Sequence, residues 1–488
     1  MAEQSGNMKM RVARTLKWNL VDKVATQILY AVTGIILARV LSEADFGLIG
    51  AILVFQAFAS MFVDSGFSYA LIQRKNPTDR DYSTVLWFNV GIASLLYVVL
   101  FFSAPLIADC FQGDARLIPL SRVMFLTFIL NALAIVQTNR LMKRMDVRMI
   151  AVSNSLGLIG GGAVGIVMAL TGFGPWALVW QAIVVAAIKT SVLWLTSSWR
   201  PLAVFSWTAL KSFFKVGSGA MVTSFLNTLF QNIYSFFIGN RVGLVPLGYY
   251  TQADKWSKMG SASISQVLTA SFVPLLAKFQ DDGENFRRYV SKINRFTGFI
   301  LFPVMTGVAM IGEPLFHTLF GDKWDAAILL FQILTVRGIF IVLISLYTNY
   351  LLSLGYARKL IMVEIVKDGL IFVAIMSTVW FHSVPLLVWG QLGASALTYM
   401  IVLAIASRST GVRISRMVGD LLPYAGMSLV MATVCWLVKP VSGVPVLQLL
   451  LMITAGMASY ILIARVSRCP ELTEAAGYLF GRFRRRRA

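Results

Sequence analysis

The polar side chains best suited to chemistry in this sequence recur at helical spacing within long apolar stretches. Within residues 17–39, Asn19, Lys23, Gln27 and Tyr30 follow one another at steps of three or four residues, which places all four on one helix face. Three further stripes consist of Gln56, Ser60, Asp64 and Ser68, then Ser224, Asn227, Gln231, Tyr234 and Ser235, then Thr251, Asp254, Lys258, Ser261, Ser265 and Thr269. Such stripes predict helix faces that bind polar groups or bond to a neighbouring helix.

The charged residues in these apolar stretches show which of the two interpretations they favour. A charge at the centre of a bilayer costs about 2.5–3.5 kcal/mol, so a charged side chain inside a span usually faces water or a partner. Lys23, Asp64, Lys255 and Lys258 therefore indicate a hydrated interior, although an alternative place for the last two is the outer mouth. For each uncharged side chain, a bond between helices, at about 0.6–2 kcal/mol, is an equal alternative. Together the stripes predict one cleft of mixed, mainly positive charge.

The motifs of covalent and nucleotide-driven chemistry are missing from the sequence. It contains no Gly-x-x-x-x-Gly-Lys-Ser/Thr loop, so it carries no ATP motor of that kind. Asp79-Arg80-Asp81 has the form of a metal-bound sugar-nucleotide site, but its loop is short and has no attached domain. Cys110, Cys435 and Cys469 fall at three levels of the predicted membrane, and neither they nor the two histidines have metal-site spacing. The sequence therefore predicts no enzyme, no cofactor and no metal site.

The stretches that carry the stripes belong to a chain suited to lipid. Hydrophobic residues make up 57% of 488 positions and charged residues 13%, which is too little charge to cover a soluble protein of this size. A helix needs about 20 apolar residues to cross a bilayer. The stretches near that length are 17–39, 46–70, 82–107, 117–138, 150–170, 174–197, 212–238, 250–275, 293–313, 326–352, 360–381, 385–406, 420–438 and 445–464. We predict an all-α integral membrane protein of about fourteen transmembrane helices.

Positive charge is concentrated on one side of the predicted membrane. The net charge is +21, which in a soluble protein would suggest nucleic acid. With a cytoplasmic N-terminus, 33 Lys and Arg residues fall in inner segments, eight in outer segments, and Lys189 and Arg337 within spans. This positive-inside bias predicts that both termini are cytoplasmic. It also predicts that the tail Arg482–Arg487 contacts anionic lipid headgroups rather than nucleic acid.

The sequence contains a weak internal repeat. One copy runs from Leu16-Lys17 to Arg39 and Phe46-Gly47, and the other runs from Leu210-Lys211 to Asn240 and Leu247-Gly248. Six predicted spans separate the copies, so both have the same orientation, as in parallel repeats related by an axis along the membrane normal. The predicted parts are a six-helix lobe at 1–200, a six-helix lobe at 201–410, two additional helices at 411–465 and a basic tail at 466–488.

Several short motifs resemble one family of transporters. ILARVLSEADFG at 36–47, LIQRK at 71–75 and YSTVLWFN at 82–89 are followed in order by GYY at 248–250 and FGDKW at 320–324. This order is similar to that of the Wzx-type polysaccharide flippases, in particular the colanic acid exporters, of the multidrug/oligosaccharidyl-lipid/polysaccharide exporter superfamily. The resemblance implies two six-helix bundles in the bacterial inner membrane that work by alternating access. It implies an undecaprenyl-pyrophosphate-linked oligosaccharide as cargo, and the bilayer and a polysaccharide polymerase machinery as partners.

This cargo gives the polar residues hypothetical roles. Cationic sites for the pyrophosphate are Lys23, Arg39, Arg241, Lys255, Lys258 and Arg337, and polar sites for the sugars are Asn19, Gln27, Gln56, Asn227, Gln231 and Tyr234. Asp64 is a candidate for pairing with a cation or coupling to a proton or sodium gradient. For Arg39 and Arg241, an interfacial anchor at a helix end is an equal alternative.

Three other functions remain open at this point. A cation-coupled drug exporter of the same superfamily favours acidic cleft residues and an apolar pocket, which this mainly cationic cleft does not suggest. A membrane polymerase or ligase of lipid-linked glycans needs a sizeable outer loop with catalytic residues, and the predicted outer loops are short. A lipid scramblase or a scaffold without vectorial transport is the third alternative.

Overall fold

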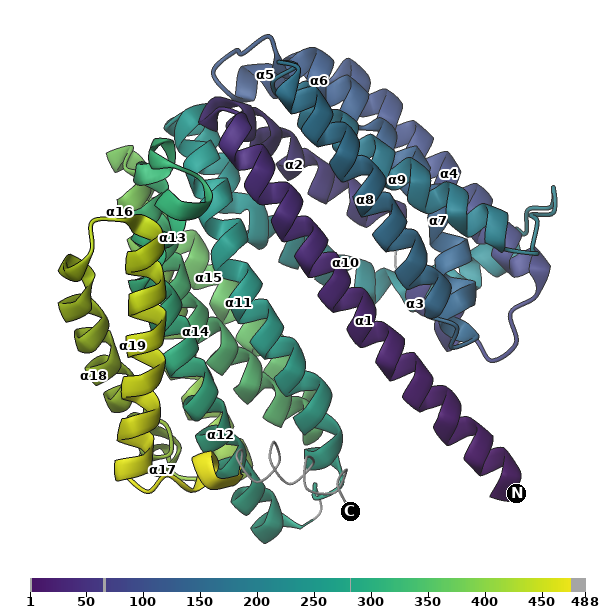
Figure 1. Ribbon diagram of the computed structural model, residues 1–488. Coiled ribbons are helices and arrows are strands. Elements are labelled where there is room, and N and C mark those ends of the chain that lie inside the picture. Colours follow the sequence, from purple (N-terminus) through teal and green to yellow (C-terminus); the bar gives the residue numbers. More distant parts are fainter. Residues whose placement is uncertain (1, 65–66, 281, 475–488) are drawn as a thin grey trace, which may run out of the picture. The chain divides into compact units, whose positions relative to one another are not determined.

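Each predicted span falls largely within the described helices (Figure 1). The computed structural model describes residues 2–64, 67–280 and 282–474, and the regular elements within these ranges are α-helices and short 3-10 helices. In lipid, a spanning segment must satisfy its own backbone hydrogen bonds, and an α-helix does so within one segment. The predicted all-α class is confirmed.

The chain divides into two structural units between Gly248 and Tyr249. The helices of the first unit are α1 (Ala2–Val40), α2 (Glu43–Asp64), α3 (Phe67–Gln73), α4 (Asp79–Phe102), α5 (Ala104–Cys110), α6 (Leu117–Met124), α7 (Leu126–Lys143), α8 (Arg148–Leu170), α9 (Trp176–Thr196) and α10 (Trp207–Arg241). Helix α10 belongs here because it packs against α2, α3 and α4. The lobe boundary predicted at residue 200 follows the repeat rather than this packing, and it remains a prediction.

Helix α11 (Leu244–Ala277) begins in the first unit and continues in the second. The other elements of the second unit are α12 (Gly283–Met310), α13 (Gly312–Leu319), η1 (Asp322–Trp324), α14 (Asp325–Ser353), α15 (Ala357–Thr378), η2 (Val379–Phe381), α16 (Val384–Thr410), α17 (Ile414–Gly419), α18 (Leu422–Val438), η3 (Lys439–Val441) and α19 (Pro445–Val466). The basic residues predicted at 482–487 lie outside the described residues.

Within the described ranges, eleven helical stretches are long and apolar enough to cross a membrane. The other three predicted spans, 212–238, 250–275 and 360–381, lie in α10, α11 and α15, which have 35, 34 and 22 residues. These helices have the length to cross but carry polar and charged side chains that lower their hydropathy. Large apolar side chains remain exposed elsewhere, such as Phe102 at 74% and Leu195 at 82%, as expected for a surface that faces lipid.

The two units repeat one packing order. In the first unit α4 packs on α7, α7 on α9 and α9 on α8, and in the second α12 packs on α14, α14 on α16 and α16 on α15. The turn after α7 has Met145 at a φ of 58°, and the turn after α14 has Gly355 at a φ of 74°. In both turns the positive-φ residue donates its N–H to the carbonyl three residues back, as helix ends with a left-handed residue commonly do. The structure therefore extends the repeat well beyond the residues that indicated it.

The two glycines of the predicted repeat contact one another's helices at the start of α2 and α11. A Cβ on Gly47 would lie 1.9 Å from the Leu244 carbonyl oxygen, and a Cβ on Gly248 would lie 2.0 Å from the Glu43 carbonyl oxygen. Each contacted residue precedes the other glycine by four positions, so the contact is reciprocal. No side chain fits there, which explains glycine at both sites.

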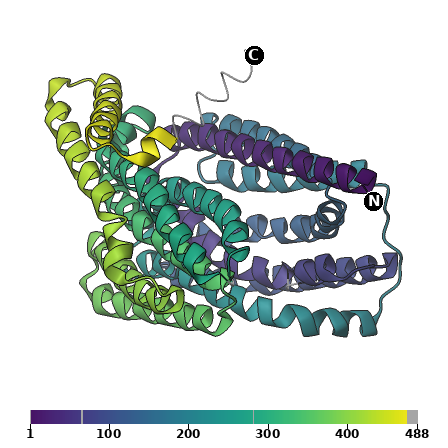
Figure 2. The ribbon, with the colours of Figure 1, turned by 90° about the horizontal axis from the view of Figure 1, so that it is seen from below.

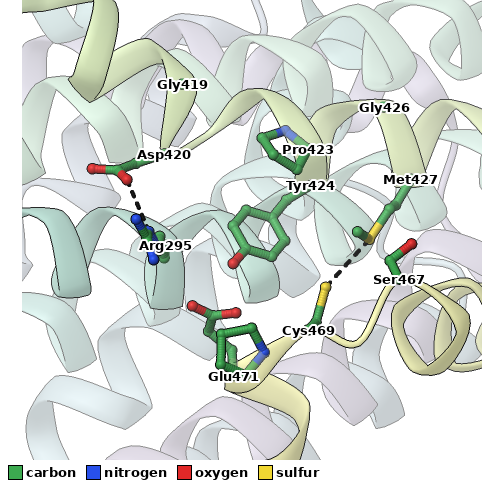
Figure 3. Close-up of a pocket in the computed structure, with 11 residues that line it drawn as sticks. Arg295, Gly419, Asp420, Pro423, Tyr424, Gly426, Met427, Ser467, Cys469 and Glu471 are labelled. Carbon is green, nitrogen blue, oxygen red and sulfur yellow. Dashed lines mark hydrogen bonds and ion pairs between the residues drawn. The ribbon is translucent and has the colours of Figure 1, made fainter.

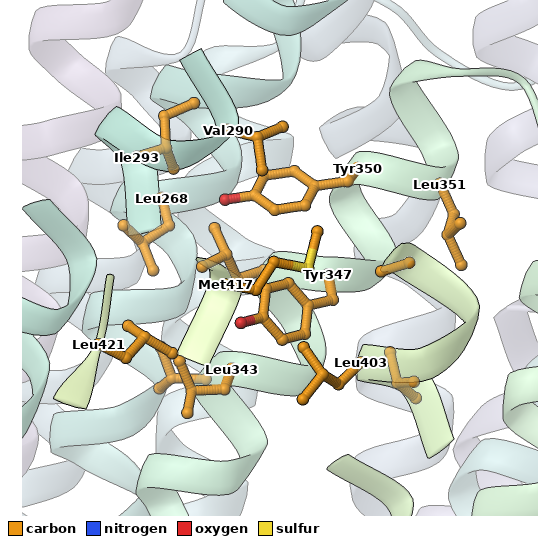
Figure 4. Close-up of a cluster of buried hydrophobic side chains, with 14 of the residues drawn as sticks. Leu268, Val290, Ile293, Leu343, Tyr347, Tyr350, Leu351, Leu403, Met417 and Leu421 are labelled. Atoms are coloured by element: carbon orange, nitrogen blue, oxygen red, sulfur yellow. The ribbon is translucent and has the colours of Figure 1, made fainter. Parts of the chain in front are cut away.

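The remaining packing fixes the helices that carry the polar stripes. Helix α1 packs along α8 in the first unit, and the two run side by side in both views (Figures 1 and 2). In the second unit, a cluster of buried apolar residues surrounds Tyr347 and Tyr350 of α14 (Figure 4). The Tyr350 hydroxyl donates a hydrogen bond of 2.8 Å to the side-chain oxygen of Asn294 on α12. Helix α1 is therefore held against α8 in the first unit, and α14 is held in a packed apolar core of the second unit.

Candidate functional site

Helix α1 separates its polar side chains between two faces. Asn19, Lys23 and Gln27 are exposed, as the predicted stripe requires. On the other face, the side-chain amide of Asn154 on α8 donates to both carboxylate oxygens of Asp22 at 3.3 Å. The packed face of α1 therefore contacts α8 through Asp22, and the other face leaves the side chains of the predicted stripe accessible.

The stripes on α2 and α10 are only partly accessible. The Gln56 amide donates to the Thr127 hydroxyl of α7 at 3.1 Å, which is the helix-to-helix bond that the alternative interpretation describes. Tyr234 is 1% exposed, whereas Gln231 is exposed and Asn227 is half-buried. Of these four, Gln231 and Asn227 are therefore the better placed to meet a ligand. The side chain of Asp64, the coupling candidate, lies outside the described residues.

Arg39 and Arg241 occupy equivalent places in the last turns of α1 and α10. Both side chains are exposed. The carboxyl end of a helix carries partial negative charge, so a cation there is favourable by about 0.3–1 kcal/mol without any ligand. Their positions fit both the anchoring role and a role in binding an anion.

In the second unit, α11 carries two lysines beside one carboxylate. The Lys258 ammonium lies 2.6 Å from the Asp254 carboxylate, and its side chain is 46% exposed. The Lys255 ammonium lies 5.3 Å from the centre of the Trp256 ring, within range of a cation–π contact. The Asp254 carboxylate therefore pairs with one of these lysines, and the Trp256 ring contacts the other.

Arg337 belongs to a hydrogen-bonded chain that links three helices of the second unit. Its Nε donates to the Ser395 hydroxyl on α16 at 3.0 Å, and that hydroxyl donates to the Gln391 carbonyl at 3.0 Å. The Gln391 amide in turn donates to the Tyr250 hydroxyl of α11 at 3.4 Å. Gln391 and Ser395 were not predicted as site residues, and Tyr250 was noted only as part of the GYY motif. The spacing of four residues between Gln391 and Ser395 within a predicted span was the signal for them.

Other charges within the predicted spans also have partners in the structure. Lys189 of α9 lies against Gly157 of α8, where a Cβ would be 3.5 Å from the lysine Cβ, and it interacts electrostatically with Asp22. On α15, Lys367 forms an ion pair with Glu364 and lies 3.9 Å from Asp368. Each of these two lysines therefore has an acidic neighbour within its own unit. Among the described residues, no three His, Cys, Asp or Glu side chains are arranged to hold a metal ion.

Comparison with known proteins gives this arrangement a context. A family model described as "Polysaccharide biosynthesis protein" matches residues 36–329. The chain belongs to this family. The resemblance that the sequence motifs indicated is thereby confirmed, and the match spans both structural units.

Three curated members are similar to this chain over most of its length. The teichuronic acid biosynthesis protein TuaB of Bacillus subtilis is 25% identical over 70% of this chain and 71% of its own. The succinoglycan biosynthesis transport protein ExoT of Rhizobium meliloti is 26% identical over 72% and 70%. The lipopolysaccharide biosynthesis protein WzxC of Escherichia coli is 26% identical over 66% of each chain.

The fold of the family member described here is also found among solved structures. It superimposes on the lipid II flippase MurJ in an inward closed conformation with a TM-score of 0.75, covering 92% of this chain and 98% of that chain. The sequences are 14% identical, so the likeness concerns the fold. Together with the apolar helices, it identifies a multi-pass membrane protein.

Proposed function

We propose that this protein is a flippase for an undecaprenyl-pyrophosphate-linked oligosaccharide. It moves the cargo from the inner to the outer leaflet of the bacterial inner membrane by alternating access, for the synthesis of a surface polysaccharide. The observation that carries the proposal is the exposure of cationic and amide side chains on helices of membrane-spanning length. Membership of the polysaccharide biosynthesis family and the similarity to ExoT, a succinoglycan biosynthesis transport protein, support it.

The polar head of the cargo is the part that cannot enter the hydrocarbon of the bilayer unaided. A pyrophosphate and several sugars lose many hydrogen bonds with water when they enter hydrocarbon. Exposed Lys23 and Lys258, with half-buried Lys255, offer ammonium groups as partners for the phosphates. Exposed Asn19, Gln27 and Gln231 offer amides to the sugar hydroxyls. The polyprenyl tail needs no such partner and stays in lipid.

Two finer parts of the proposal concern the cycle and its setting. Arg39, Arg241 and Arg337 supply further cationic contacts as the cargo advances, and Asp64 couples the cycle to a cation gradient. The lobes 1–200 and 201–410 are the moving parts, and both termini are cytoplasmic. The product is delivered to a polysaccharide polymerase machinery on the outer side.

The test removes the three ammonium groups one at a time. Lys23→Gln, Lys255→Gln and Lys258→Gln should each lower surface polysaccharide about tenfold or more, because each removes a charge-assisted contact of about 1.5–3 kcal/mol. Surface polysaccharide and accumulated lipid-linked precursor are quantified in cells that lack the native gene. Lys75→Gln, in an exposed loop outside the stripes, is the matched control. Normal polysaccharide in all three variants at normal protein level would contradict the proposal, and intact polysaccharide with new drug sensitivity would favour a drug exporter.

A further inference from the structure

A polar cavity of about 520 Å³ lies within the second unit (Figure 3). Helix α12, the start of α18 and the segment that follows α19 form its walls. Its ionisable lining residues are Arg295, Asp420, Tyr424, Cys469 and Glu471. None of them belongs to the stripes assigned to the cargo.

The cavity has more negative than positive charge. One oxygen of Asp420 accepts a hydrogen bond of 2.8 Å from the Nε of Arg295. The other oxygen of Asp420 and one oxygen of Glu471 are buried and have no hydrogen-bond partner. Asp420 is 5% exposed and Glu471 is 8% exposed. Among the described residues that line the cavity, a single guanidinium therefore faces two buried carboxylates, and a buried carboxylate without full compensation is costly.

The neighbouring groups do not supply the missing positive charge. The Tyr424 hydroxyl points toward the Glu471 carboxylate (Figure 3), and it is neutral. Burial and the nearby Glu471 raise the pKa of the Cys469 thiol, so the thiol also stays neutral at physiological pH. The two carboxylate oxygens of Asp420 and Glu471 that have no partner among the described residues are therefore suited to a cationic hydrogen-bond donor from a ligand.

An apolar groove of about 450 Å³ adjoins this cavity along the same helices. Its lining comes from α12, α18 and α19 and includes Phe299, Met431, Met452 and Tyr460. The groove also includes Leu472, the residue after Glu471 of the polar cavity. The Tyr460 hydroxyl donates to the Phe299 carbonyl at 2.9 Å, which removes its polar atom from the groove. A charged cavity beside an apolar groove suits one amphiphilic molecule.

We propose that the cavity and the groove together bind an aminophospholipid. Its primary ammonium lies between the carboxylates of Glu471 and Asp420, its phosphate contacts Arg295, and one acyl chain occupies the groove. The positive-inside bias puts the ends of α12, α18 and α19 that form the cavity at the cytoplasmic leaflet, the level of a headgroup. The proposed cargo does not fit, because its pyrophosphate would face two carboxylates.

The test measures lipid binding by the full-length protein purified in detergent. Phosphatidylethanolamine, phosphatidylcholine and phosphatidylglycerol with matched acyl chains are titrated, and bound lipid is measured by native mass spectrometry. Phosphatidylethanolamine should bind about tenfold more tightly than the other two, because only its headgroup donates charged hydrogen bonds to carboxylates. Glu471→Gln should remove this preference. Glu474→Gln is the matched control, because Glu474 is 48% exposed and pairs with Lys292 at 2.9 Å.

Equal affinity for the three lipids, or an unchanged preference in Glu471→Gln, would overturn the proposal. Soluble phosphoethanolamine separates headgroup from lipid: binding as tight as that of the whole lipid would leave the groove without a role and overturn it too. If Glu471→Gln does not fold, Ile453→Trp decides, since it fills the groove and leaves the carboxylates intact. It should weaken lipid binding about tenfold and leave phosphoethanolamine binding unchanged.

Discussion

At the scale of single residues, some charged side chains within the helices have a partner on another helix, and others have a partner on their own helix. Asp22 accepts hydrogen bonds from Asn154 across a helix interface. Lys258 pairs with Asp254 one turn away on its own helix, and Arg337 donates to Ser395. Partners on a different helix hold two helices together, whereas a partner on the same helix only lowers the local charge. The first kind should matter most for stability.

The Asp22–Asn154 contact tests this distinction. Asn154→Ala leaves the half-buried carboxylate with the weak hydrogen bond from Thr26, at 3.4 Å, and the electrostatic interaction with Lys189. We expect a loss of about 1 kcal/mol, at the lower end for an orphaned polar group, because solvent reaches part of Asp22. The measurement is the midpoint of thermal unfolding in detergent. Asn131→Ala, at an exposed amide on α7, is the control, and equal midpoints for both variants would show that the contact contributes nothing.

For the candidate site, the sequence predicted the types of residue and the helix face that each occupies, but not which of these faces are covered by other helices. Spacing alone indicated that Asn19, Lys23 and Gln27 share a face, and all three are exposed. Spacing did not indicate that Gln56 turns toward Thr127 or that Tyr234 is buried. Periodicity assigns a side chain to a face of its helix, and only the neighbouring helices decide whether that face is covered.

At the scale of elements, the length of a bilayer crossing made the helices predictable. The points at which these helices are interrupted were harder to predict from the sequence. The predicted span 82–107 consists of α4 and α5, which part at Ser103, and the predicted span 293–313 consists of α12 and the start of α13. Hydropathy averaged over about 20 residues does not register a single residue that ends one helix and caps the next. Helix α5 does have a proline in its first turn, a signal that marks a helix start.

The reciprocal contact of Gly47 and Gly248 makes a prediction for α2 and α11. A methyl group at either position meets a backbone carbonyl, which cannot rotate away as a side chain could. Gly47→Ala and Gly248→Ala should each cost about 1–3 kcal/mol, as overpacking does, and by similar amounts because the geometry is reciprocal. Thermal unfolding in detergent measures both. Gly91→Ala on α4, where nothing lies within 4 Å of a new Cβ, should be neutral or slightly stabilising; a similar loss at Gly91 would contradict this account.

At the scale of the whole molecule, the repeat links the separate observations. Each unit has the same order of packed helices, and each carries exposed cations: Arg39 and Lys23 in the first unit, Lys258 in the second. Two copies of one architecture, each with its own cations, suit an anionic head that passes from one set of partners to another. The proposed aminophospholipid site is formed in part by α18 and α19, which follow the repeated helices in the chain.

The direction of such transport depends on the orientation of the chain, which the charge bias predicts. Arg and Lys are retained on the cytoplasmic side during insertion, so the loop at 74–78 should be inside and the loop at 111–116 outside. In a Cys110→Ser background, Asn76→Cys and Gln112→Cys place single thiols at exposed positions in these loops, while Cys435 and Cys469 are buried. A membrane-impermeant maleimide should label Gln112→Cys in spheroplasts and label Asn76→Cys only after lysis. The reverse labelling pattern would show that the protein has the opposite orientation in the membrane, so that the cargo is taken from the other leaflet.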